Sequence, residues 1–279
     1  MLALLMTMLC GAGYVFAMKM TEVKKGNRYA ATMINYIFGV VASAVLMEKK
    51  IFFYNTPEGW FALGLSIVTS ICMVAGMMYG RKCIAANGAP MQATFYKLGI
   101  LIPMACSLVF FGEIPTLPQI IGVAIVVFAL VFMNLSLADS KNITSFPLLI
   151  IMFVIGGLVE FSFKVYNMYG DIEIKEYYLF YNFLFAAIIS LVILLKNNKN
   201  IKKDDVIWGV LTGIPNYFIM FFSLLAVAAL PTYIVYPTSS VGTILIVNLL
   251  NLVLFKEVPT KKELIATGFI LVALVFLNI

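Results

Sequence analysis

The chain contains no histidine, and its four cysteines form no CxxC pair: Cys10, Cys72, Cys83 and Cys106. A zinc site of the usual histidine and cysteine type is therefore not expected. The sequence also has no P-loop, in which Gly-Lys is followed by Ser or Thr, so nothing in it supports direct coupling to ATP hydrolysis. We expect neither a metal ion nor a cofactor.

Charged residues are also scarce. They make up 11% of the chain, against about 25% in a soluble domain, while 63% of the residues are hydrophobic and the mean hydropathy is +1.03. A soluble globule could not bury this much apolar side chain, so lipid must cover it. The net charge of +6 is modest, and Lys and Arg lie mostly between apolar runs, where they act as topology signals and contact lipid headgroups. No basic cluster with interleaved aromatics indicates a nucleic-acid partner.

Long apolar runs dominate what is present. A helix needs roughly 20 apolar residues to cross a bilayer. Polar or charged breaks divide the chain into ten runs, at about 1–18, 30–47, 58–80, 88–111, 118–137, 146–168, 176–195, 206–229, 231–255 and 261–278. The connections are short. We therefore predict an all-α integral membrane protein with ten transmembrane helices.

The end of the first half of the chain is repeated at the end of the second half. Residues 110–135 and 254–279 align without a gap, and 10 of the 26 aligned positions are identical, including Glu113 with Glu257. Weaker matches lie upstream and pair Lys19 with Lys164, Asn35 with Asn182, and Trp60 with Trp208. Such duplication in an apolar chain indicates a membrane transporter built from two related halves.

The two halves, 1–140 and 141–279, contain five predicted spans each. Because five is an odd number, two copies joined head to tail must cross the membrane in opposite directions. We therefore expect an inverted repeat, with the substrate site near the middle of the membrane where the halves meet.

The residues that carry the repeat also resemble a known family. Gly112-Glu-Ile-Pro-Thr-Leu-Pro-Gln-Ile-Ile-Gly122, followed by an apolar span, is similar to the end of an EamA-type repeat of the drug/metabolite transporter superfamily. Lys256-Glu-Val-Pro-Thr260 looks the same, and Gly11 and Lys19 also fit. The resemblance covers essentially the whole chain. It implies a ten-helix carrier with a central cavity, cytoplasmic termini and no ATP-hydrolysing part.

The charge distribution disagrees with that resemblance on orientation. The loops after the odd-numbered spans hold 14 basic residues, whereas the opposite side holds only Lys49, Lys50 and Lys175. The positive-inside rule therefore places both termini outside. We favour the charge count, because it is the physical signal in this chain.

Lys97 is the sharpest candidate for a functional residue, and it follows Tyr96 well inside the fourth span. A charge at mid-bilayer costs at least ~2.5–3.5 kcal/mol on insertion scales, so it normally faces a cavity or a partner. For Lys97 we favour a site for an anionic group of the substrate over a structural ion pair, and we assign the neighbouring Tyr96 to the same substrate site.

Glu160 and Lys164 lie four residues apart in the sixth span, where they share one helix face and can pair. Glu160 is a candidate for coupling to protons or for binding a substrate cation. Mutual neutralisation with Lys164, or pairing with Lys97, is an equally good structural reading. A structural role and a substrate-binding role therefore both remain open for Lys164.

Polar residues of the eighth and ninth spans complete the candidate substrate site: Asn216, Tyr217, Tyr236, Ser239 and Ser240. Pro215 and Pro237 each free a backbone carbonyl there, and freed carbonyls and hydroxyls can line a hydrated cavity. Three further residues are assigned to a structural or a substrate role: Tyr14, Asn35 and Asn182. For the two asparagines we favour an interhelical hydrogen bond.

Glu113 and Glu257 begin tight Glu-x-Pro-Thr loops, and we read them as structural. Thr116 and Thr260 in the same loops are positioned to cap the next helix.

The leading hypothesis is a secondary carrier that moves a small anionic or zwitterionic, amino-acid-like metabolite by alternating access. A multidrug exporter of lipophilic cations is the alternative, which the fixed positive charge of Lys97 disfavours. A more distant alternative is an intramembrane enzyme, which would want a histidine, a carboxylate pair or a metal. We expect no enzymatic activity, and as partners a small-molecule substrate and membrane lipids. We also expect a monomer in the bacterial cytoplasmic membrane.

Overall fold

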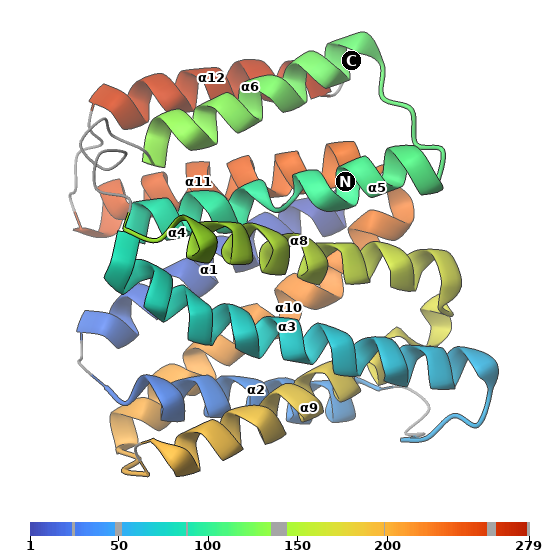
Figure 1. The fold of residues 1–279 in the computed structure, drawn as a ribbon, viewed down its shortest axis with the longest axis vertical. Coiled ribbons are helices and arrows are strands. Elements are labelled where there is room, and N and C mark those ends of the chain that lie inside the picture. The colour runs from blue at the N-terminus through green and yellow to red at the C-terminus, as the bar shows by residue number, and fades with distance from the viewer. Residues whose placement is uncertain are drawn as a thin grey trace. The chain divides into compact units, whose positions relative to one another are not determined.

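The computed structural model describes residues 1–23, 26–47, 52–87, 89–134, 144–197, 199–255 and 261–277. All regular structure in these ranges is helical (Figure 1). The α-helices are α1 (Leu2–Val23), α2 (Arg28–Leu46), α3 (Pro57–Asn87), α4 (Ala89–Leu98), α5 (Leu101–Phe110), α6 (Leu117–Asn134), α8 (Phe146–Tyr169), α9 (Lys175–Lys196), α10 (Lys203–Ala229), α11 (Thr232–Phe255) and α12 (Lys261–Leu277). A 3-10 helix, η1 (Ile172–Ile174), precedes α9. The all-α class predicted from the sequence is confirmed.

Each of the ten predicted apolar runs corresponds to an apolar helical segment. Seven of these segments in the described ranges are long and apolar enough to cross a membrane, and they lie in α2, α3, α4 with α5, α8, η1 with α9, α10, and α11. The other three are shorter: Leu2–Met18, Leu117–Phe132 and Leu264–Leu277. The chain is therefore a multi-pass integral membrane protein. The inverted relation between its halves stays a prediction.

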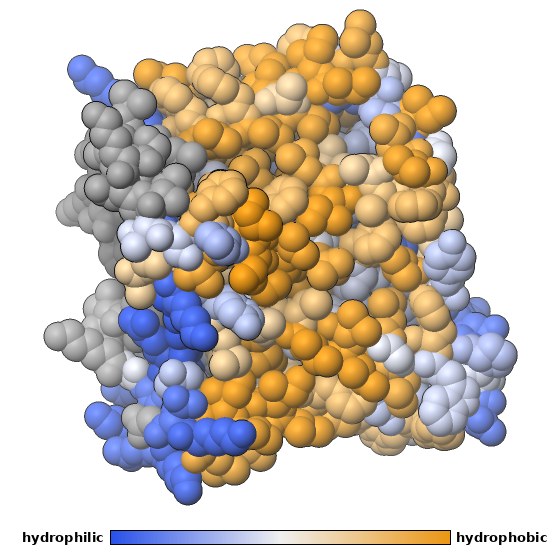
Figure 2. All heavy atoms as spheres, in the orientation of Figure 1, coloured by the Kyte–Doolittle hydropathy of each residue, from blue (hydrophilic) through white to orange (hydrophobic). Residues whose placement is uncertain are grey.

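The outer surface of the helices is apolar. Large hydrophobic side chains such as Val109, Phe110 and Val45 are exposed by two thirds or more. Figure 2 shows hydrophobic residues along the lengths of the helices and hydrophilic residues toward their ends. Water cannot cover an apolar surface of this extent favourably, so the exposed helix sides face lipid.

The described helices form two compact units. Unit 1 comprises Met1–Val74 and Val165–Ala226, and unit 2 comprises Ala75–Lys164 and Val227–Ile279. Each unit combines segments from both sides of residue 140. The units therefore do not test the repeat boundaries at 1–140 and 141–279, which concern duplication of the sequence and stay a prediction.

In unit 1, α2 and α9 lie side by side along their lengths (Figure 1). Glycine allows this close approach, because a Cβ added at Gly39 would lie 2.2 Å from the Phe183 ring. Hydroxyl groups of α3 form hydrogen bonds with α9. Ser66 and Ser70 each donate a hydrogen bond of 3.1 Å to a backbone carbonyl of α9, at Tyr178 and Asn182.

In unit 2, α6 and α12 form the main helix pair (Figure 1). Their shared core contains Val126, Leu130 and Ile270, joined by Val241 of α11. Two other helices of this unit carry charged residues that the sequence singled out, Lys97 on α4 and Glu160 and Lys164 on α8.

The start of α6 shows one part of the predicted capping chemistry. Thr116 is the residue immediately before the helix, and its backbone N–H donates a 2.8 Å hydrogen bond to the side chain of Gln119. This is one half of a capping box, in which the residue at the third helical position satisfies the N–H of the capping residue. The corresponding Thr260 and Glu257 lie outside the described residues.

Candidate functional site

Lys97 lies at a break in a membrane-spanning helix. Helix α4 ends at Leu98, and α5 begins at Leu101. Across the break the N–H groups of Gly99 and Ile100 donate to carbonyls only three residues earlier, at Tyr96 and Lys97, over 3.2 and 3.3 Å. The sequence predicts a single run over 88–111, and the structure divides it just after Lys97.

Pro103 supplies a physical reason for this break. Proline has no N–H to donate to the carbonyl four residues earlier, which belongs to Gly99. That carbonyl instead accepts a 2.9 Å hydrogen bond from Ile102, three residues on. The interruption leaves Lys97 in the last turn of α4, where the partial negative charge of a helix C-terminus favours a cation.

Glycines bring α8 into backbone contact with this break. A Cβ added at Gly99 would lie 2.5 Å from the Gly157 nitrogen, and one added at Gly156 would lie 2.4 Å from the Tyr96 carbonyl oxygen. Real Cβ atoms essentially never approach so closely. Gly156 is one turn before Glu160, so the same contact places the Glu160 segment beside the Lys97 segment.

Lys97 and Glu160 are both half-buried and interact electrostatically. Within the described ranges, no ion pair of 4.0 Å or less joins them. A cation and a carboxylate that lie near each other without forming an ion pair can each bind an oppositely charged group of a third molecule.

Helix α11 contributes Tyr236 to the same place. The Tyr236 hydroxyl donates a 2.7 Å hydrogen bond to the backbone carbonyl of Glu160. Ser239 donates to the carbonyl of Tyr236 over 3.1 Å, and the next residue, Ser240, is half-buried. Tyr96 is 37% exposed, with its ring close to Gly156. Lys97, Glu160 and Tyr236 therefore form a polar site on α4, α8 and α11, which we call the Lys97–Glu160 site.

The other predicted site residues lie in unit 1, apart from Lys164. Asn216 of α10 donates a 3.0 Å hydrogen bond to Asn35 of α2. The side-chain amide of Asn182 is buried and has no hydrogen-bond partner in the part of the chain that the structure describes. Tyr217 is fully buried against Phe183 and Phe221. Tyr14 is half-buried on α1.

Lys164 pairs with a residue that the sequence assigned only to a loop. Its Nζ lies 2.5 Å from Glu113 Oε1, and the side chains are 7% and 15% exposed. The Lys164 ammonium also lies 5.5 Å from the centre of the Phe111 ring. Within the described residues, Lys164 therefore pairs with Glu113 and not with Glu160, its neighbour along the helix.

Glu113 also caps the start of α11. Its Oε2 accepts hydrogen bonds from the backbone N–H and the hydroxyl of Thr232, the first residue of that helix, over 2.9 and 2.5 Å. Burial by itself would raise the pKa of the Glu113 carboxyl. Hydrogen bonds from Lys164 and Thr232 and the charge of Lys164 outweigh burial and leave this pKa below its ordinary value of 4.5. The Glu113–Lys164–Thr232 cluster thus holds an ionised carboxylate.

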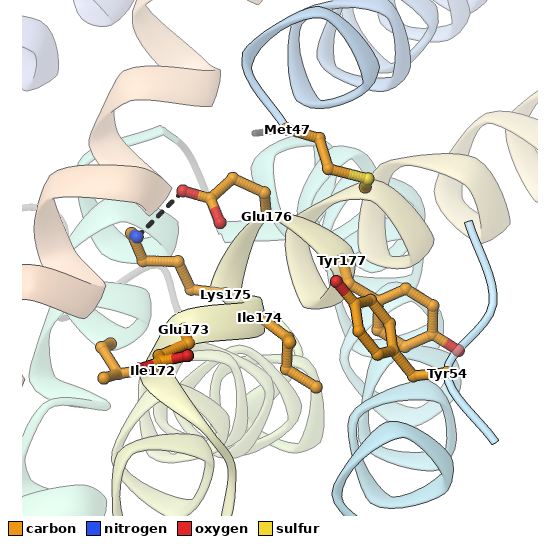
Figure 3. Close-up of a pocket in the computed structure, with 8 residues that line it drawn as sticks. All are labelled: Met47, Tyr54, Ile172, Glu173, Ile174, Lys175, Glu176 and Tyr177. Atoms are coloured by element: carbon orange, nitrogen blue, oxygen red, sulfur yellow. Dashed lines mark ion pairs between the residues drawn. The ribbon is translucent and has the colours of Figure 1, made fainter. Parts of the chain in front are cut away.

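Sequence reasoning missed a cavity in unit 1. This cavity, which we call the η1 pocket, has a volume of about 430 Å³ and lies at the junction of α8, η1 and α9 (Figure 3). Its lining residues are Met47, Tyr54, Ile172, Glu173, Ile174, Lys175, Glu176 and Tyr177. The signal in the sequence was Glu173-Ile-Lys-Glu176, three charges within four residues at the end of a span. The sequence pattern assigns Lys175 only a role in membrane topology.

No protein-family profile matches the chain. An uncharacterized protein of Methanocaldococcus jannaschii is 22% identical over 135 residues, which cover 48% of this chain and 95% of that protein. A solved crystal structure of a protein superposes with a TM-score of 0.76 at 13% sequence identity, over 99% of this chain and 94% of the other. At this identity the likeness concerns the fold alone.

Proposed function

We propose that this protein is a secondary transporter of the EamA type, within the drug/metabolite transporter superfamily. Its substrate is a small anionic or zwitterionic, amino-acid-like metabolite. The observation that carries the proposal is the position of Lys97 and Glu160 beside a break in a membrane helix, near each other and, within the described residues, with no ion pair between them. Interrupted helices that meet at membrane depth are a recurrent way to build a transporter site.

The chemistry of the site supports this substrate class. The Lys97 ammonium, at the interrupted end of α4, binds a carboxylate or phosphate of the substrate. Glu160 binds the ammonium group of a zwitterion, or carries the proton that couples transport. A lipophilic cation would meet the repulsion of Lys97, which disfavours multidrug export. We propose no enzymatic role.

The archaeal relative supports the duplicated architecture. Since 95% of it aligns with 48% of this chain, it is about half as long, which is the length of one five-helix repeat. Two such repeats of opposite orientation allow the site to open to one face of the membrane at a time. We place this carrier in the cytoplasmic membrane of a bacterium, as a monomer in contact with lipid.

Transport by purified protein in liposomes tests the proposal. Lys97→Ala should abolish saturable uptake and counterflow of amino acids, with a normal amount of protein in the membrane. Lys82→Ala is the matched control, because Lys82 is an exposed lysine on α3 of the same unit. If Lys97→Ala transports at the original rate, Lys97 is not in the site. If only quaternary amines are carried, the substrate class is wrong.

A further inference from the structure

The η1 pocket is a second place where charges of both signs line a cavity. Lys175 and Glu176 form an ion pair of 2.9 Å, with side chains 19% and 12% exposed. Figure 3 shows this pair at the wall of the pocket, with Tyr54 and Tyr177 on another side. The pocket belongs entirely to unit 1, whereas the Lys97–Glu160 site belongs to unit 2.

The local fold fixes the positive side of the pocket. Lys175 is the first residue of α9, and its ammonium is held 5.7 Å from the centre of the Phe221 ring on α10. The residue before α9, Ile174, makes no side-chain capping hydrogen bond. The pocket lining therefore includes an ammonium at the start of a helix, where the positive end of the helix dipole also favours an anion.

Two carboxylates lie among the described residues that line the pocket. Glu176 pairs with Lys175, and Glu173 is a second carboxylate of the lining. The rings of Tyr54 and Tyr177 meet edge to face, with centres 5.2 Å apart. Carboxylates beside aromatic rings suit an ammonium group, because both attract a cation.

A ligand of one charge sign would separate Lys175 from Glu176 and leave one of them without a partner. Breaking a mostly buried pair in this way is strongly unfavourable. A zwitterion offers each member a new partner, so it can enter without that penalty. The apolar lining, Met47, Ile172 and Ile174, then contacts the rest of the ligand. A volume of about 430 Å³ falls within the roughly 300–1,000 Å³ of small-molecule pockets.

We propose that the η1 pocket binds a small zwitterion, with its anionic group at Lys175 and the start of α9 and its ammonium group at Glu176 and Glu173. The inference does not depend on transport through the Lys97–Glu160 site. Two sources share this chemistry: a free amino acid with an apolar side chain, and the headgroup of phosphatidylethanolamine.

Calorimetric titration of the full chain in detergent distinguishes these sources. The first probes share one carbon skeleton: L-leucine as the zwitterion, L-leucinamide as the cation and 4-methylpentanoate as the anion. Glycerophosphoethanolamine represents the headgroup. We expect binding of a zwitterion at least about tenfold tighter than either singly charged analogue. Leucine binding assigns a free amino acid, and binding of glycerophosphoethanolamine alone assigns the lipid.

Substitutions in and outside the pocket test whether the zwitterion binds there. Glu176→Gln should weaken zwitterion binding about tenfold or more, because one charge-assisted contact is lost. Ile172→Trp should abolish it by filling the pocket and leave the ion pair intact, since Ile172 is 40% exposed. The matched control is Glu58→Gln, an exposed glutamate of the same unit outside the pocket.

Lys97→Ala separates this inference from the proposed function. If zwitterion binding persists in Lys97→Ala and is lost in Ile172→Trp, the η1 pocket is the site. Binding lost in Lys97→Ala but retained in Ile172→Trp would overturn the inference and leave the transport proposal standing. The inference about the η1 pocket is also overturned if none of the zwitterions binds, or if a singly charged analogue binds as tightly as a zwitterion.

Discussion

At the scale of single residues, Glu113 is the clearest case of a side chain whose role depends on distant partners. Its carboxylate contacts Lys164, 51 residues away, and Thr232, 119 residues away. The carboxylate balances a buried ammonium and also satisfies the first N–H of α11. The sequence places Glu113 in a loop before α6, but the residues of that loop do not indicate that Lys164 and Thr232 are its partners.

Removing this carboxylate should destabilise the protein strongly. Glu113→Ala leaves the Lys164 ammonium buried without a counter-charge and α11 without its cap, which costs roughly 3–5 kcal/mol. Denaturant unfolding in detergent measures the loss. Glu58→Ala, at an exposed position in the first turn of α3, should change the free energy of unfolding by less than about 1 kcal/mol. An equal effect of both substitutions would contradict the role given to Glu113.

The lowered pKa of Glu113 also predicts an acid-sensitive component of stability. A carboxyl whose pKa is lower in the folded state binds fewer protons there than in the unfolded state. Its contribution is complete above the ordinary pKa of 4.5 and declines as the pH falls through the lower folded value. Wild type should therefore lose stability below about pH 4.5, more steeply than Glu113→Gln. Unfolding curves measured at stepwise lower pH compare the two proteins.

Glu160 carries a third prediction at this scale, which rests on the proposed function. If its carboxyl takes up the coupling proton, Glu160→Gln should remove the pH dependence of transport while binding of the substrate anion at Lys97 persists. Uptake rates over a pH series in liposomes measure this. An unchanged pH profile would place the coupling at another residue.

At the scale of helices, the α4–α5 break and its contact with α8 decide where Lys97 and Glu160 lie. Three glycines make the contact, and a Cβ at any of them would lie within 3 Å of backbone atoms. The sequence identified the charged residues and the apolar span. It did not identify the contact, because glycine in an apolar run also serves ordinary helix packing.

A methyl group at this contact should separate the two helices. Gly156→Ala places a Cβ 2.4 Å from the Tyr96 carbonyl oxygen, so α8 must move away from α4, and we expect both the stability and the proposed transport activity to fall. Gly64→Ala on α3 is the control, because a Cβ there meets nothing within 4 Å. Replacing glycine inside a helix should itself stabilise by roughly 0.5–1 kcal/mol. Thermal unfolding and uptake compare the two variants. Full transport by Gly156→Ala would show that the close contact is not needed.

At the scale of the whole molecule, membrane insertion follows from composition, and the charges between spans predict the orientation. The exposed helix sides are apolar, as lipid contact requires. The charge count places the loop between α9 and α10 in the cytoplasm, whereas the EamA resemblance places it outside.

Cysteine labelling decides between these orientations. In a background without the four native cysteines, Lys199→Cys should be protected from an impermeant maleimide in intact cells and become labelled after permeabilisation. Ile114→Cys, at a position 77% exposed between α5 and α6, should be labelled in intact cells. The reverse pattern would contradict the charge count and support the family resemblance.

The sequence alone determined the solvent, the helical class and the positions of ten apolar segments, because lipid solubility and helix length are summed over neighbouring residues. It also selected Lys97 and Glu160, since a charge is conspicuous inside an apolar run. Pairings between distant residues were decided by the tertiary structure. Lys164 is four residues from Glu160 and yet binds Glu113, Asn35 binds Asn216, and the η1 pocket joins the end of α2 to the start of α9. Such contacts depend on which faces of the helices pack against each other. Helix packing joins residues that lie far apart in the sequence, and a local sequence pattern contains no information about it.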